Sequence, residues 1–164
     1  MKQKEGKTER TNVMRLLDQK GVRYESHCYA DTDALAGTEV AEALGEKPEQ
    51  VLKTLVTVGA SRQHYVFLVP VEKSLHLKKA AKAVGEKSIE MILARELLPL
   101  TGYIHGGCSP IGMKKPFRTV IDASAENQEK IFFSAGKIGY QIETTLAELR
   151  KALVFETAEI TEEA

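Results

Sequence analysis

The segment Gly106–Gly112, GGCSPIG, combines residues that could do chemistry with residues that prevent regular structure. Its three glycines and one proline are incompatible with a helix or an ordinary strand. Cys108 lies at its centre and His105 precedes it, so a thiolate and an imidazole could form a nucleophile pair. The spacing is not diagnostic, however, and no third orienting residue is evident. Because buried cysteines are common in protein cores, we do not favour Cys108 as a nucleophile.

The backbone of this loop offers a second kind of chemistry. Glycines allow consecutive N–H groups to converge on one point, which can hold a phosphate or a developing oxyanion. A second loop, Ser134–Gly139 (SAGKIG), has the same character and follows a predicted strand. Neither loop contains a Walker A or GxGxxG pattern, so no nucleotide fingerprint is present. Tight turns also need glycine, but two such loops in one chain favour a binding role.

A lysine within an apolar run is the third candidate. Lys53 lies in the sequence VLKTL, at the start of a predicted strand. Such a lysine can lie at a strand end or on a solvated face. Alternatively, its ammonium can point into a pocket and meet an ester carbonyl or a phosphate. The histidines at 27, 64 and 76 show no metal-ligand spacing, so we expect no metal and no cofactor.

The elements that must position these residues alternate between short helices and strands. Periodicity and capping signals predict helices over 11–20, 38–44, 75–84, 94–98 and 145 to about 153. In the second of these, Thr38 is the expected N-cap and Gly45 the stop, and in the third Leu77 is expected to face inward. Strands are predicted over 22–28, 53–58, 65–69, 118–122, 130–134 and 139–142. Many connections are too short for parallel crossovers. We therefore expect an α/β fold: a mixed, mostly antiparallel sheet curled towards a barrel, with flanking helices.

Length and composition bound the kind of protein. The chain has 164 residues, of which 43% are hydrophobic and 28% charged, as expected for one globular domain. We predict a single domain over 1–164 with its core at about 11–155. No apolar run approaches the roughly 18 residues needed to cross a bilayer, and the charged start lacks a secretion signal. Together with only two cysteines, these features predict a cytoplasmic protein.

The net charge is zero but unevenly distributed. Residues 73–118 hold nine Lys or Arg and three Glu, whereas residues 143–164 hold six Glu, one Arg and one Lys. A basic middle segment permits binding to a phosphate backbone, although an ordinary solvated surface would carry the same charges.

Four segments, in this order, resemble one family. They are Lys53-Thr54-Leu55, the run from Leu77 to Gly85 (LKKAAKAVG), Thr101-Gly102-Tyr103 leading into Gly106–Gly112, and Ser134–Gly139. The combination is similar to YbaK-type Cys-tRNA(Pro) deacylases and covers the chain from about Val13 to Leu149. The resemblance implies a free-standing editing protein related to the editing domain of prolyl-tRNA synthetases. Such a second site is needed because a small pocket discriminates poorly between cysteine and proline.

The resemblance also implies roles for individual residues. The catalytic set would be Lys53, Gly106, Gly107 and Ser134. The substrate-binding set would be Tyr29, Thr54, Ser109, Pro110, Gly112 and Gly136. For the tRNA acceptor stem, the basic stretch offers Lys78, Lys79, Lys82, Lys114 and Lys115. Prolyl-tRNA synthetase is a further candidate partner.

The implied mechanism is substrate-assisted: the thiol of the bound cysteine attacks its own ester carbonyl. The family pattern departs at Gln141, where a member has aspartate, and at Leu35-Ala36, where it has an Asn-Phe pair. Both changes bear on pocket size and on the amino acid accepted. Two alternatives remain open: a deacylase of the same fold that uses activated water on another small amino acid such as alanine, and a non-catalytic module that binds tRNA or a synthetase.

Overall fold

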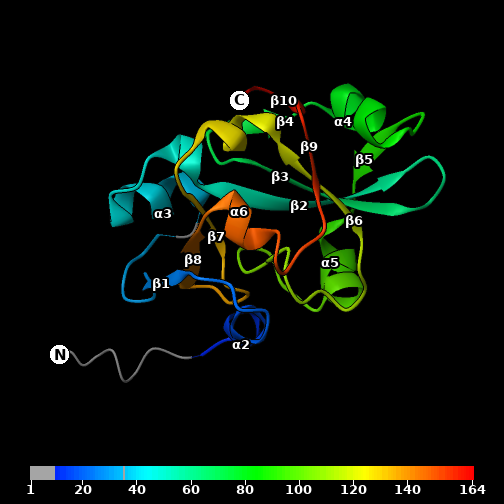
Figure 1. The fold of residues 1–164 in the computed structure, drawn as a ribbon. Helices are drawn as coiled ribbons and strands as arrows, with labels where there is room; N and C mark the ends of the chain where they lie inside the picture. Colours follow the sequence, from blue (N-terminus) through cyan, green and yellow to red (C-terminus); the bar gives the residue numbers. More distant parts are fainter. Residues whose placement is uncertain (1–9, 35) are drawn as a thin grey trace.

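The computed structural model describes residues 10–34 and 36–164 and places a five-stranded mixed sheet at the centre (Figure 1). In sheet order the strands are β5 (Ile89–Met91), β2 (Leu52–Gly59), β3 (His64–Pro70), β6 (Arg118–Asp122) and β9 (Glu156–Ala158). β2 and β3 form the antiparallel hairpin predicted from the sequence, with Leu52 opposite Pro70. β6 joins β3 in parallel, and β9 joins β6 in parallel.

Two smaller antiparallel sheets complete the strands. One has the order β1 (Glu25–Cys28), β8 (Tyr140–Thr144) and β7 (Ile131–Ser134), and the other pairs β10 (Thr161–Glu163) with β4 (Lys73–Leu75). An isolated parallel bridge from Val51 to Phe132 joins the residue before β2 to β7 and so connects the three-stranded sheet with the large one. The mixed, mostly antiparallel α/β arrangement predicted from the sequence is confirmed, although the described strands do not close into a barrel.

Short helices pack around these sheets. They are α2 (Asn12–Gln19), α3 (Gly37–Leu44), α4 (Leu77–Val84), α5 (Ala94–Thr101) and α6 (Leu146–Leu149), with 3₁₀ turns at Pro48–Gln50 and Ala123–Asn127. Their caps follow the sequence signals: Thr11 accepts from the N–H of Met14, and Thr145 accepts from the N–H of Glu148. None of the helices in the described part of the chain has the length and apolar character needed to span a membrane.

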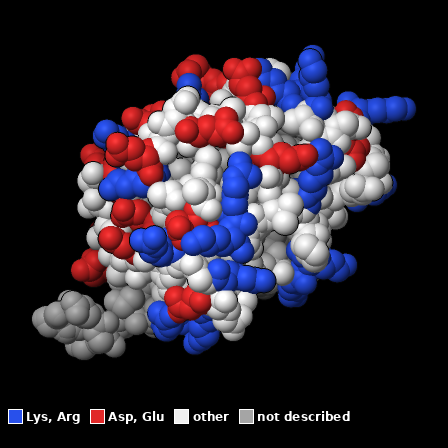
Figure 2. Space-filling model, viewed as in Figure 1, with Lys and Arg blue, Asp and Glu red and all other residues white. Residues whose placement is uncertain are grey.

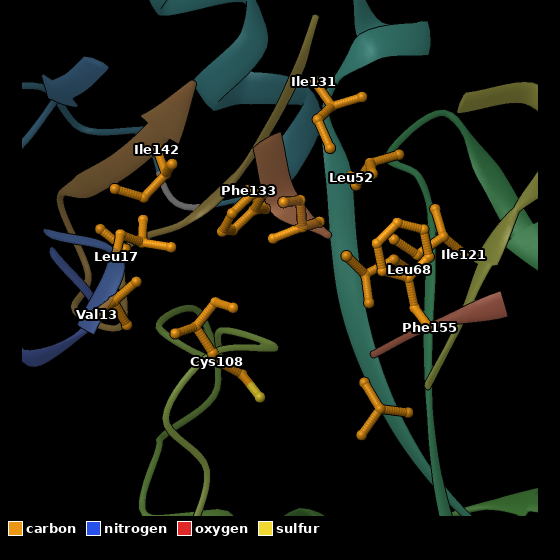
Figure 3. Packing of buried hydrophobic residues seen from close by; sticks show 14 of the residues in the cluster. Val13, Leu17, Leu52, Leu68, Cys108, Ile121, Ile131, Phe133, Ile142 and Phe155 are labelled. Atoms are coloured by element: carbon orange, nitrogen blue, oxygen red, sulfur yellow. The ribbon is translucent and has the colours of Figure 1, made fainter. Parts of the chain in front are cut away.

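Alternation along β3 divides the hydrophobic core. Tyr65, Phe67 and Val69 pack with α4 on one face, whereas Val66 and Leu68 belong to a larger cluster on the other face. Figure 3 shows this larger cluster as two groups of side chains. One includes Val13 and Leu17 of α2 and Ile142 of β8, and the other includes Leu52, Leu68, Ile121 and Phe155, with Ile131 of β7 next to Leu52.

Two sequence predictions about helix starts are wrong. Thr38 is not the N-cap of α3, because that helix begins at Gly37 with Ala36 as its cap, and the Glu39 side chain accepts from the Ala36 N–H. The helix predicted from Leu75 begins at Leu77 instead, because Leu75 pairs with Thr161 in β4. Leu77 is also 40% exposed rather than inward. The pairing partner of β4 lies more than eighty residues away, so local periodicity could not reveal it.

Candidate active site

A cavity of about 570 Å³ lies between β2, β7, β8 and the first turns of α3 and α5. Its size is that of a site for a small organic group. Its walls are mostly apolar, and members of the larger core cluster such as Leu52, Val56 and Phe133 form part of them. The polar residues that line it include Tyr29, Lys53, Thr54, His105, Ser134 and Gln141.

Lys53 is the only Lys or Arg among the described residues that line this cavity. Its side chain is partly buried, and this burial lowers the pKa of the Lys53 ammonium. The described residues provide no salt bridge to it, in contrast to Lys73, Lys79 and Lys130, which face carboxylates. An ammonium that has lost part of its water and has no carboxylate partner is suited to bind an oxygen of a ligand.

The edge of β2 beside the cavity is open at Thr54. β5 pairs with β2 only from Thr57 to Gly59, and the N–H of Ile92 donates to the carbonyl of Val56 at 3.4 Å. Because alternate residues of a strand direct their backbone groups to the same edge, Thr54 directs its N–H and C=O to this side too. Its hydroxyl oxygen is buried and has no hydrogen-bond partner in the described chain. Thr54 therefore offers polar groups to the cavity.

The two glycine-rich loops lie against each other. A Cβ on Gly107 would lie 3.1 Å from the backbone N of Ile138, so a side chain here would require the loops to move apart by a few tenths of an ångström. The second loop also contacts Tyr29, which follows β1. The N–H of Tyr29 donates to the carbonyl of Gly139, the last residue before β8, at 2.7 Å. This contact places Tyr29, which is 6% exposed, at the cavity wall.

Only part of the first loop reaches the cavity. His105, Gly106 and Cys108 line it. The Gly107 N–H donates to the carbonyl of Ile104 at 2.9 Å, so in this conformation it is engaged in the turn itself.

The rest of that loop is packed inward. Ser109 is fully buried, and its hydroxyl accepts from the Ile111 N–H at 3.3 Å. Pro110 is buried as well, and Gly112 leaves room for the hydroxyl of Tyr103, which donates to the carbonyl of Ile111. The structure therefore brings Ser109, Pro110 and Gly112 close to the site without placing them in its lining.

Of the two predicted site residues in the second loop, Ser134 lines the cavity and Gly136 does not. The Ser134 hydroxyl oxygen accepts from the N–H of Gly136 at 3.0 Å. The hydroxyl proton of Ser134 is then left to donate elsewhere. Gly136 has a φ of +91°, and a Cβ there would lie 2.8 Å from Val13, so this glycine is required for packing against α2.

Cys108 has the properties of an inert thiol. Burial raises its pKa to about 12, so the thiol stays protonated near neutral pH. The thiolate is the nucleophilic form of cysteine. Although His105 and Cys108 both line the cavity, this pKa argues against the nucleophile pair that their spacing raised.

Gln141 and Glu46 were not among the predicted site residues. Gln141 lines the cavity and is 3% exposed, and its Nε2 donates to Glu46 Oε1 at 2.9 Å. Burial raises the pKa of the Glu46 carboxyl, partly offset by this hydrogen bond. The departure from the family pattern at Gln141 was the one sequence signal for this position. No sequence signal connected it with Glu46, 95 residues away.

The predicted tRNA-binding lysines fall into two groups. Lys78, Lys79 and Lys82 lie on α4, which packs on the face of the large sheet opposite the larger core cluster. Lys114 instead contacts the end of α5, where its ammonium donates to the carbonyl of Pro99, and exposed Lys115 follows it. In Figure 2 basic side chains are spread over the visible face and do not gather in one patch.

One group outside the cavity has metal-ligand types. Glu25, His27 and Glu143 offer ligand atoms within 4.8 Å of one another. His27 Nε2 already lies 2.7 Å from Glu143 Oε1, and the Lys130 ammonium lies 3.5 Å from Glu143 Oε2. Because an ammonium already neutralises this carboxylate, we assign the group to an ion-pair network across β1 and β8.

Comparison with known proteins identifies the class to which this fold and cavity belong. Residues 32–152 match the family model described as the aminoacyl-tRNA editing domain. The chain belongs to this family, and it has the aminoacyl-tRNA deacylase function that the sequence predicted.

Individual relatives narrow the comparison. The chain is 46% identical over 136 residues to a protein of Enterococcus faecalis, EbsC, whose name is that of a Cys-tRNA(Pro)/Cys-tRNA(Cys) deacylase; the match covers 82% of this chain and 83% of the relative. It is 28% identical over 107 residues to the proline–tRNA ligase of Burkholderia thailandensis, covering 63% of this chain and 18% of the ligase. A crystal structure titled as a trans-editing enzyme for prolyl-tRNA synthetase superposes with a TM-score of 0.78 at 25% identity, covering 94% and 99% of the two chains.

Proposed function

We propose that this protein is a trans-editing deacylase that releases cysteine from mischarged Cys-tRNA(Pro) and also from Cys-tRNA(Cys). The 46% identity to EbsC supports this specificity, and the match to part of a proline–tRNA ligase supports a link to prolyl-tRNA synthesis. One observation carries the mechanism: the described residues that line the cavity include no Asp or Glu, and their one thiol, that of Cys108, stays protonated. The protein therefore offers little with which to activate water or to attack the ester itself.

The reactive thiol in this proposal arrives with the substrate. The cysteine sulfur attacks its own ester carbonyl, a C–S bond forms, and the C–O bond to the terminal ribose breaks. The ribose oxygen takes up the proton that the thiol loses, and free tRNA leaves. The cysteine thiolactone that remains is hydrolysed by water to cysteine. The protein contributes position and charge stabilisation, which can account for a large share of a rate enhancement.

Each lining residue then has a task. The Lys53 ammonium orients the ester or the terminal adenosine, and the backbone at Gly106 faces the developing oxyanion. Gly107 supports that backbone through its turn contact with Ile104 and its packing on the second loop. The Ser134 hydroxyl donates to the substrate, and Tyr29 and Thr54 fix the aminoacyl group.

The tRNA body is held separately and weakly in this proposal. Lys114 contacts α5, the helix whose first turn lines the cavity, and we therefore assign the acceptor stem to Lys114 and Lys115 in preference to the lysines of α4. Contacts to phosphates release counterions, and the KM for tRNA should therefore rise with salt.

The decisive experiment is a deacylation panel with Cys-, Ala-, Ser- and Pro-tRNA(Pro). We expect Cys-tRNA(Pro) to be hydrolysed at least a hundredfold faster than Ser-tRNA(Pro), because serine has the same shape but a far weaker nucleophile. Lys53→Ala should lower kcat/KM by about a hundredfold or more. Lys87→Ala, at an exposed lysine, is the matched control.

Three outcomes would reject the scheme. Activity that is lost in Cys108→Ala but unchanged in Lys53→Ala would make Cys108 the nucleophile. Faster hydrolysis of Ala-tRNA(Pro) than of Cys-tRNA(Pro) would favour the water-activating alternative, for which His105 is the base that the cavity offers. Binding of tRNA without turnover of any ester would identify a non-catalytic module.

A further inference from the structure

Two buried polar atoms of the cavity have no hydrogen-bond partner among the described residues: Gln141 Oε1 and Thr54 Oγ1. Both residues line the cavity, and Gln141 is 3% exposed. A buried acceptor without a donor is costly, and native proteins rarely retain one without a reason. Gln141, a residue of the cavity lining, therefore carries a buried acceptor that lacks a donor among the described residues.

The orientation of the Gln141 amide is determined by its other end. Its Nε2 donates to Glu46 Oε1 at 2.9 Å. A carboxylate only accepts hydrogen bonds, so turning the amide over would place the carbonyl oxygen against the carboxylate. Glu46 thus keeps the nitrogen of the amide on its own side, and the oxygen is the end of the amide that is left without a partner.

Glu46 is itself held by the end of α3. Gly45 adopts the left-handed conformation with φ +70°, and the Glu46 N–H donates to the carbonyl of Ala41 at 2.8 Å. The charges of His27, Glu143 and Lys130, which pair with one another, also act on the Glu46 carboxyl. The position of Glu46 is therefore determined by backbone geometry as well as by its surroundings.

We propose that Gln141 Oε1 accepts a hydrogen bond from the α-ammonium group of the aminoacyl ester, and that Glu46 is the positioning residue that directs this oxygen into the cavity. The inference rests on the proposed function, because it names the part of the substrate that this position reads. An ammonium fits better than a thiol or a hydroxyl, because the Glu46 carboxylate lies directly behind the amide and favours a cation. The oxygens of Thr54 provide further acceptors at the open edge of β2.

The test compares two esters on the same tRNA(Pro): cysteinyl and 3-mercaptopropionyl. The second retains the thiol and lacks only the amino group. We expect the wild type to favour the cysteinyl ester by about ten- to a hundredfold in kcat/KM, as a hydrogen bond to a charged group would give. Gln141→Leu and Glu46→Leu should abolish this preference by slowing the cysteinyl ester only. Glu46→Gln, which can still accept from Gln141, should retain part of it.

Controls separate this role from a structural one. Glu42→Gln, at an exposed position of α3, should leave the preference unchanged. A variant that merely damages the fold slows both esters equally, and equal slowing in Gln141→Leu would overturn the inference. An equal rate for the two esters in the wild type would overturn it as well, while leaving the deacylase proposal intact.

A binding measurement makes the inference independent of turnover. The probes are 3′-deoxyadenosine carrying cysteine in a 3′-amide and the matching 3-mercaptopropionyl amide, with affinities measured by calorimetry. We expect the wild type to bind the cysteinyl amide about ten- to a hundredfold more tightly than the mercaptopropionyl amide. We expect Gln141→Leu to bind the two amides with equal affinity. If the wild type binds both amides equally, Gln141 does not read the amine. If the preference holds but no aminoacyl ester is turned over, the deacylase proposal fails and the binding site stands.

Discussion

The two glycine-rich loops share glycine, serine and isoleucine but have different tasks. The first, Gly106–Gly112, places Gly106 and Cys108 in the cavity wall and packs its second half inward. The second, Ser134–Gly139, places only Ser134 in the wall and uses Gly136 to pack on α2. Glycine therefore permits close packing in both loops, but only the first loop also places a glycine, Gly106, in the cavity wall.

The largest effect is expected where glycine permits packing. Gly136→Ala should destabilise the protein by about 3 kcal/mol, because its φ of +91° strains any side chain and the new Cβ would lie 2.8 Å from Val13. Gly106→Ala should cost only about 1 kcal/mol, since its Cβ would meet Ile138 at an ordinary 3.5 Å. Urea unfolding monitored by circular dichroism measures both.

Gly21→Ala is the control for backbone strain alone, because its φ is +71° and nothing lies within 4 Å of the new Cβ. If Gly136→Ala costs no more than Gly21→Ala, the second loop is not a packing device and the contrast between the loops disappears.

A smaller effect is expected at Ser134, the one residue of the second loop in the cavity wall. Ser134→Ala removes the acceptor of the Gly136 N–H and should cost about 1 kcal/mol of stability. In the proposed function it also removes a donor to the substrate, so kcat/KM for Cys-tRNA(Pro) should fall about tenfold.

Ser124→Ala serves as the comparison for Ser134. The Ser124 hydroxyl donates a hydrogen bond to Asp122, and Ser124 does not line the cavity. We therefore expect Ser124→Ala to lose a similar amount of stability while its kcat/KM stays unchanged. A full rate in Ser134→Ala would make the second loop purely structural.

The smallest effect on activity is expected at Cys108, the most reactive residue type of the first loop. Cys108→Ala should keep kcat/KM within about threefold and lose about 1 kcal/mol of stability through the small cavity it leaves. The variant Cys28→Ala leaves Cys108 as the one thiol that iodoacetamide can alkylate. Since burial raises the Cys108 pKa to about 12, we expect this alkylation to be slow in the folded variant.

The alkylation rate of Cys108 should increase about tenfold per pH unit from pH 7 to pH 10, because the thiolate fraction rises in that proportion below the pKa. In the wild type, the exposed Cys28 should be modified first. Rapid modification of Cys108 at pH 7 would indicate an activated thiol and reopen the nucleophile interpretation.

Much of this architecture follows from local sequence. The β2–β3 hairpin, the cap at Thr11, the left-handed glycines that end α3 and α4, and the cap at Thr145 are all recognisable within a few residues. The predicted capping box at Thr145 forms only in part, because the Glu148 side chain accepts from the N–H of Arg23. The three-residue strands β4, β5, β9 and β10 were not predicted. Each is too short for a visible alternation and exists only because a distant partner pairs with it.

The candidate site was also predictable from the sequence only in part. The sequence alone determined which residues are unusual: a lysine in an apolar strand, two glycine-rich loops and a glutamine where a relative has aspartate. Only the tertiary structure decided which of them meet at the cavity and that Glu46 orients Gln141. The reason is physical, because burial and partner choice depend on contacts between residues far apart in the chain, and it is these contacts that change a pKa or leave an acceptor without a donor.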